Sequence, residues 1–133
     1  MATAGVKTRD RNGRFSEQLP RTQQLGLAER ITWSAEVFGS SAKLAEWLQV
    51  SPSTLSRWQS GKTTPDAARA QWIIDLDFIA ARAATVWGSG ALTPWLNGNN
   101  AFLGGATPLD MIRHGRTSEV VMALSAEGSE VYA

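Results

Sequence analysis

The stretch SAKLAEWLQVSPSTLSRWQS, residues 41–60, decides the fold of this chain of 133 residues. Its second half opens with Ser51, a residue type that caps helix N-termini, and with Pro52, which suits the first helical position. Gly61 follows and is expected to end that helix, while two serines at 40–41 can cap a helix before it. The pattern predicts two short helices with a turn of three or four residues between them.

A longer helix is predicted directly before this stretch. The apolar residues that recur there at spacings of three and four are Leu27, Ile31, Ala35 and Phe38. Such spacing places them on one face of a helix, and Gly39 then stops it. A long helix followed by two short helices across a turn is the arrangement of a helix-turn-helix. We therefore expect residues 22–64 to form a helix-turn-helix domain.

The apolar side chains of residues 41–60 fall where such a motif clamps its two helices together. They are Leu44, Leu48, Val50, Leu55 and Trp58. Ala45 stands where the helices cross too closely for a larger residue. With the GKTTP that follows, residues 41–60 resemble the Xre/Cro-type helix-turn-helix family. Gln49 stands where that family usually has a glycine in a left-handed turn, which costs about 1 kcal/mol.

In this motif the start of the second helix enters the major groove of DNA. The short or hydrogen-bonding residues of that surface are Ser51, Ser53, Thr54, Ser56 and Arg57. Arg57 is the candidate for a bidentate guanine contact, which is worth about 1–3 kcal/mol of discrimination. Lys43, Lys62 and Thr63 are expected to hold phosphates. Because basic residues are sparse, two hypotheses stay open: a DNA reader that needs a dimer, and a motif kept only as a scaffold.

Charge is distributed unevenly along the chain, although the net charge is only +1. Residues 1–70 carry a charge of +4 and residues 71–133 a charge of −3. The first 21 residues lack an amphipathic period, so we expect a flexible basic arm there. Its candidate DNA-contacting cations are Lys7, Arg9, Arg11 and Arg14. Such an arm could follow a phosphate backbone or enter a minor groove; the alternative is a tail without a role.

The chain offers little support for catalysis. It has no cysteine, which excludes disulfides and thiol chemistry. His114 is the lone histidine and is expected to be a surface or helix-capping residue. The carboxylates have no paired or metal-ligand spacing, and Gly104-Gly105 lacks the further glycines or lysine of a phosphate loop. We therefore expect neither an enzyme nor a cofactor, metal or small-molecule substrate.

The apolar runs indicate where the protein resides. They are too short and too often interrupted by charges to span a membrane. No apolar signal core follows Met1. We expect a soluble, cytoplasmic protein.

A long helix is predicted over residues 65–87, with Thr64 as its cap and Pro65 at its start. One apolar stripe of this helix holds Trp72, Ile73, Leu76, Ile79, Ala80 and Ala83, and a second holds Ala67, Ala70, Ile74, Phe78 and Ala81. A helix that is apolar on two sides is buried on two sides. The first stripe is expected to cover the helix-turn-helix. The second is expected to pack against residues 95–115, with a second copy of the chain as the alternative.

Residues 88–133 are predicted to form a C-terminal domain of short helices. Pro94 and Pro108 each follow a threonine and open a helix. The last helix is expected over residues 117–127, with Gly128 ending it and a free tail after it.

The order of these pieces resembles the C-terminal toxin-binding domain of the Xre/MbcA/ParS-type antitoxins. The residues that carry the likeness are Trp95, Leu96, Asn100, Leu103, Gly104, Gly105, Pro108, Leu109, Asp110, Gly115, Val120, Leu124 and Gly128. Together with the helix-turn-helix, the likeness covers residues 22–130. Asn99 departs from it, because the family commonly has a proline in this turn.

The resemblance implies an all-α antitoxin without catalytic activity. Its partner would be a toxin with a RES domain, which consumes NAD or transfers its ADP-ribose. The C-terminal end of the antitoxin would block the toxin's active site. The expected toxin-binding residues are Trp95, Phe102 and Leu103, with Val131, Tyr132 and Ala133 as the plug.

The resemblance also implies a role at DNA. Through the helix-turn-helix the protein would bind operator DNA and repress its own operon, as a homodimer or as a larger hetero-oligomer with the toxin. A different class of function stays open as the alternative. In that hypothesis the chain is a stand-alone transcriptional regulator, and its C-terminal part serves only dimerisation.

Overall fold

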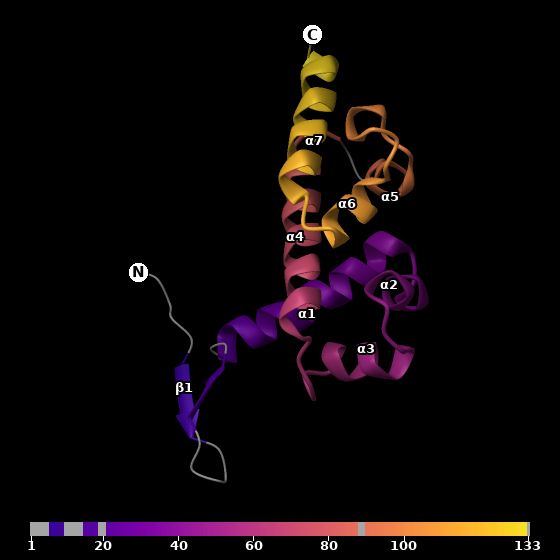
Figure 1. Ribbon diagram of the computed structural model, residues 1–133. Coiled ribbons are helices and arrows are strands. Elements are labelled where there is room, and N and C mark those ends of the chain that lie inside the picture. The colour runs from indigo at the N-terminus through magenta and orange to yellow at the C-terminus, as the bar shows by residue number, and fades with distance from the viewer. Residues whose placement is uncertain (1–5, 10–14, 19–20, 88–89, 133) are drawn as a thin grey trace.

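The computed structural model describes residues 6–9, 15–18, 21–87 and 90–132, and the side chains of residues 26–87 and 90–128. The helices are α1 (Arg21–Phe38), α2 (Ser41–Leu48), α3 (Pro52–Gln59), α4 (Ala67–Ala83), α5 (Leu92–Asn97), the 3-10 helix η1 (Ala101–Leu103), α6 (Pro108–Arg113) and α7 (Thr117–Tyr132). The body of the protein is helical, which confirms the predicted all-α class. In Figure 1, α4 stands between α1–α3 at one end and α5–α7 at the other.

The N-terminal region departs from the expectation of an arm without regular structure. Strands β1 (Val6–Arg9) and β2 (Phe15–Gln18) pair antiparallel, with Val6 opposite Gln18 and Arg9 opposite Phe15. Figure 1 shows this hairpin beside the start of α1, at the end of the molecule away from α7. Strands of four residues show too little alternation to be recognised from sequence.

The two short helices begin where the serines predict. The Ser40 hydroxyl accepts the backbone N–H of Lys43 at 3.2 Å, and the Ser51 hydroxyl accepts that of Thr54 at 3.1 Å. Pro52 occupies the first turn of α3. Each cap satisfies an N–H that has no partner inside its own helix.

The turn between α2 and α3 is left-handed at Gln49, as expected, with φ 59° and ψ 44°. Among the described residues, Gln49 is the one non-glycine residue with positive φ. Arg69 of α4 reaches this turn, where its Nε donates to the Leu48 carbonyl at 2.7 Å and its Nη2 to the Gln49 carbonyl at 3.4 Å. These bonds satisfy carbonyls at the end of α2 and offset part of the cost of the backbone conformation.

The start of α4 lies two residues later than predicted, and its cap is Asp66, not Thr64. The Asp66 carboxylate accepts the backbone N–H of Arg69 at 3.3 Å and pairs with its guanidinium at 3.2 Å. Burial by itself raises the pKa of Asp66, but the hydrogen bonds and charge of Arg69 outweigh it and lower that pKa. The helix also ends earlier, at Ala83, so Trp87 lies in the segment that follows the helix.

One face of α4 forms the centre of the core. Ile73, Leu76 and Ile79 of the first stripe are fully buried. Helices α1, α6 and α7 all pack on α4, and residues from both halves of the chain belong to one buried cluster. Trp47 of α2 ties these halves together directly, because its indole N–H donates to the Leu109 carbonyl at 3.2 Å.

The second stripe of α4 does not pack against residues 95–115, so that expectation was wrong. Ile74 is 37% exposed and Phe78 is 49% exposed. Buried residues of the 95–115 block, such as Leu96 and Ile112, instead join the cluster that holds the first stripe. The physical reason is length, since a helix of 17 residues spans about 25 Å and can cover both halves with one face.

Helix α7 continues through Gly128 to Tyr132, which corrects the expected helix end and free tail. It lies alongside α4, where the Thr117 hydroxyl donates to the Asp75 carboxylate at 2.9 Å. Gly128 packs beside Val86, and a Cβ added there would make an ordinary contact of 3.4 Å with a Val86 methyl group. A glycine inside a helix costs about 1 kcal/mol, which such packing can override.

Candidate functional site

The start of α3 carries a connected group of polar side chains. The Ser51 hydroxyl lies 3.1 Å from that of Ser53 and 2.8 Å from that of Thr54. Arg57 Nη2 donates to the Thr54 hydroxyl at 3.2 Å, which uses one of five guanidinium donors. Ser51, Ser53 and Arg57 are exposed, as is Ser56. The structure therefore brings the expected base-reading residues together on one surface, called the α3 surface below.

The three expected phosphate ligands lie nearer the other end of α3. Lys62 and Thr63 follow the helix, and their backbone N–H groups both donate to the Arg57 carbonyl, at 2.9 and 3.4 Å. Lys43 lies in the first turn of α2, which contacts the end of α3 through a Gln59–Ser41 hydrogen bond of 3.5 Å. The side chains of Lys43, Lys62 and Thr63 are all exposed.

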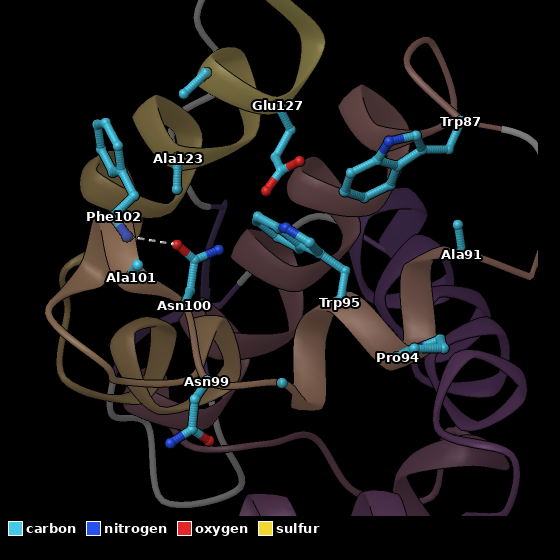
Figure 2. A pocket seen from close by; sticks show the side chains of 12 residues that line it. Trp87, Ala91, Pro94, Trp95, Asn99, Asn100, Ala101, Phe102, Ala123 and Glu127 are labelled. Atoms are coloured by element: carbon cyan, nitrogen blue, oxygen red, sulfur yellow. Dashed lines mark hydrogen bonds between the residues drawn. The ribbon is translucent and has the colours of Figure 1, made fainter. Parts of the chain in front are cut away.

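At the other end of the molecule an open hollow of about 850 Å³ lies between α5, η1 and α7. Figure 2 shows its lining side chains. They are Trp87, Ala91, Pro94, Trp95, Gly98, Asn99, Asn100, Ala101, Phe102, Ala123, Ala126 and Glu127. The rings of Trp87 and Trp95 are 5.4 Å apart between centroids and inclined at 60°. We call this hollow the Trp95 pocket.

The turn before η1 fixes one wall of the Trp95 pocket. The Asn100 side chain accepts the backbone N–H of Phe102 at 2.9 Å, and the Asn100 carbonyl accepts that of Gly105 at 2.9 Å. Phe102 is thereby held 55% exposed, whereas its neighbour Leu103 is 9% exposed and belongs to the core. Of the three aromatic and leucine residues expected to bind the toxin, Trp95 and Phe102 line the pocket, and Leu103 packs inside.

The rest of the expected toxin-binding set lies at the C-terminus. Val131 and Tyr132 are part of α7, and Ala133 lies outside the described residues. Sequence reasoning missed Trp87 and Glu127 as pocket residues. No local pattern could have found them, because 40 residues separate them and only the packing of α7 beside the end of α4 brings them together.

Two polar features of the Trp95 pocket are unusual. The indole N–H of Trp95 is buried and has no acceptor among the described residues. The ion pairs in that part of the chain are Arg30–Asp77, Arg69–Asp66, Arg113–Asp110 and Arg116–Glu119, so Glu127 has no cation there. The pocket is therefore lined by a carboxylate without a cation partner and by an indole whose buried N–H makes no hydrogen bond within the described part of the chain.

The exposed stripe of α4 is a second apolar surface. Phe78 and Ile74 form it, and the guanidinium of Arg82 lies 5.8 Å from the centre of the Phe78 ring. Beside it, Arg30 of α1 pairs with Asp77 at 3.2 Å. Surfaces of this kind are commonly covered in an assembly.

Features of other site classes are sparse in the described ranges. His114 ends α6, and its Nδ1 lies 2.6 Å from the Asp110 carbonyl, which confirms a helix-capping histidine. Among the described residues, no group of three His, Cys, Asp or Glu side chains is placed to hold a metal ion. None of the helices in these ranges has both the length and the apolar character needed to cross a membrane.

Comparisons with known proteins give one consistent result. No family model matches the chain. It is 24% identical over 107 residues to the mycobacterial cidal antitoxin MbcA of Mycobacterium tuberculosis and of Mycobacterium bovis, covering 80% of this chain and 95% of the relative. It also matches a chain in the crystal structure of the M. tuberculosis MbcT-MbcA toxin-antitoxin complex, with a TM-score of 0.65, 24% identity and coverage of 80% and 97%. The chain thus shares the fold of that protein and is similar in sequence to MbcA, which confirms the predicted resemblance to the Xre/MbcA/ParS-type antitoxins.

Proposed function

We propose that this chain is the antitoxin of a toxin–antitoxin pair and acts by binding its toxin. The observation that carries the proposal is the similarity to MbcA over 95% of the length of that antitoxin. The Trp95 pocket adds a physical reason, since exposed aromatic side chains around a hollow are typical anchors of protein interfaces. Phe102, more than half exposed, is such an anchor.

We further propose that the toxin has a RES domain that consumes NAD or transfers its ADP-ribose, and that the C-terminal end of α7 occludes the toxin's active site. The family resemblance supports this mechanism. The continuation of α7 through Tyr132 gives it a physical form, because a helix presents Val131 and Tyr132 with less loss of entropy than a loose tail would.

Co-expression with the product of the neighbouring gene tests this proposal. The full chain should form a stable complex, restore growth and prevent loss of NAD. A variant that lacks residues 129–133 should still assemble but inhibit less. Failure of the full chain to bind or to protect NAD would contradict the antitoxin function, whereas equal loss of assembly and inhibition in the truncated variant would contradict the plug alone.

A role at operator DNA is the second proposal, and the connected Ser51–Thr54–Arg57 group supports it. One copy offers few phosphate contacts, so we propose that two copies bind together and read two half-sites. The exposed stripe of Ile74 and Phe78 is the surface proposed to join them. Ile74→Glu should leave a monomer in sedimentation and weaken operator binding; an unchanged oligomeric state would exclude this stripe as the dimer contact.

The stand-alone regulator remains the competing function. It shares the DNA surface and the dimer but needs no toxin. The Trp95 pocket favours the antitoxin, because a regulator that uses its C-terminal part only for dimerisation has no need of an aromatic hollow far from the α4 stripe.

A further inference from the structure

We propose that the Trp95 pocket binds the guanidinium of an arginine presented by the partner protein, in the corner formed by the touching rings of Trp87 and Trp95 and beside the carboxylate of Glu127. This proposal rests on the proposed function, because it requires a protein partner. It adds the chemistry by which the partner is recognised.

The aromatic walls suit a flat cation. Trp87 and Trp95 are each partly exposed, and their rings meet at 60° with centroids 5.4 Å apart. Indole faces attract cations more strongly than the other aromatic rings do, and arginine can also stack on them through its planar group. Two inclined indoles therefore form a corner into which a guanidinium fits with one face on a ring.

The charge of the pocket selects a cation over an apolar side chain. Glu127 is the one ionisable residue among the lining residues, and Figure 2 shows its side chain extending between the rings of Trp95 and Trp87. Helix α7 contains no basic residue, and Arg116, which directly precedes it, is already paired with Glu119 at 2.9 Å. Burial removes part of the water around the Glu127 carboxylate, and no cation of the described residues replaces it. A cation from a partner would therefore bind this carboxylate at a smaller further cost of desolvation.

The orphaned indole N–H of Trp95 is consistent with a pocket that changes on binding. A buried donor without an acceptor makes no hydrogen bond that a reorientation of the ring would lose. The Trp95 indole therefore makes no hydrogen bond to the described residues that holds its ring in this orientation.

The occupant is expected from the partner and not from this chain. The hairpin that holds Lys7 and Arg9 lies at the far end of the molecule from α5 and α7 in Figure 1. The pocket instead lies beside the second half of α7, whose C-terminal end is proposed to meet the toxin. A toxin held by that end would pass over the pocket.

The test is the affinity of the full-length chain for its toxin at low and at high salt. Glu127→Gln should weaken binding by about tenfold at low salt and reduce the salt dependence. Glu119→Gln is the matched control, because Glu119 lies on the same helix but is already paired with Arg116 of this chain. It should change affinity by less than about twofold. Thermal melts verify that both variants fold like the wild type.

The partner's arginine is found by changing each arginine of the toxin surface to glutamine. One such change should be non-additive with Glu127→Gln in a double-mutant cycle. Wild-type affinity and salt dependence in Glu127→Gln, or no non-additive arginine, would overturn this inference and leave the antitoxin function standing. If Glu127→Gln changed only the self-association of the chain, the pocket would bind a second copy, and this inference would be overturned as well. Absence of any complex with the wild-type chain would overturn both proposals.

Discussion

The α3 surface and the Trp95 pocket lie at opposite ends of α4 and differ in kind. The α3 surface is exposed and polar, and its residues come from one helix and the residue before it. The Trp95 pocket is hollow and aromatic, and its residues come from the segment after α4, from α5 to η1 and from α7. The first suits the grooves and phosphates of a nucleic acid, and the second suits an anchoring side chain of a protein. The difference teaches that the surfaces proposed for the two partners share no residue.

The largest effect is expected where both surfaces depend on the same residues. Leu76 is fully buried in the core that both halves share. Leu76→Ala should destabilise the protein by about 2–5 kcal/mol, measured by denaturant unfolding, and reduce operator and toxin binding together. Gln71→Ala, on the exposed side of the same helix, should change stability by less than about 0.5 kcal/mol. Loss of only one activity in Leu76→Ala would show that the halves fold independently.

The second-largest effect is expected from a variant that changes only the Trp95 pocket. Phe102→Ala removes an exposed aromatic anchor and should weaken toxin binding by about 30-fold, which corresponds to about 2 kcal/mol. Operator affinity and the melting temperature should hardly change. Phe78→Ala, which removes an exposed phenylalanine from α4, is the control. If calorimetry gave the same loss of toxin affinity for both variants, the pocket would not be the specific contact.

A somewhat smaller effect is expected from a variant that changes only the α3 surface. Arg57→Ala should cost about 1–3 kcal/mol in operator binding and relax the preference at one base pair, because it removes a possible bidentate contact. Toxin affinity should stay the same. Arg116→Ala, which removes an exposed arginine just before α7, is the control in a gel-shift or fluorescence-anisotropy titration. Unchanged operator affinity in Arg57→Ala would favour a motif kept as a scaffold.

The smallest effect concerns the turn that sets the angle between α2 and α3. Gln49→Gly should stabilise the protein by up to about 1 kcal/mol, because glycine adopts a left-handed backbone without strain. Gln71→Gly, in a regular helix, should destabilise it by a similar amount. Opposite signs in thermal unfolding would confirm the turn geometry, and a loss of stability in Gln49→Gly would contradict it.

Local sequence signals predicted most of the helix boundaries in the N-terminal half of the chain. Ser51 with Pro52 predicted the start of α3 and Gly39 the end of α1, since each depends only on neighbours in the chain. The left-handed turn at Gln49 followed instead from the resemblance to the Xre/Cro-type helix-turn-helix family. The prediction of Thr64 as the cap of α4 is wrong. Asp66 caps in the structure, where it also pairs with Arg69.

Long-range packing accounts for what the sequence could not predict. Gly128 has the local character of a helix end, but α7 continues through it and packs beside Val86. The same packing of α7 brings Glu127 to Trp87 and Trp95 and so creates the pocket. Both apolar stripes of α4 look alike in sequence, and only the placement of α1, α6 and α7 on one side decides which stripe is buried.

The most direct test of two separate surfaces is hydrogen exchange of the full chain with and without its toxin. Residues 91–102 and 119–132 should gain protection on binding the toxin, and residues 51–57 should not, while operator DNA should give the reverse pattern. Protection of α3 by the toxin, with none around the Trp95 pocket, would contradict the account.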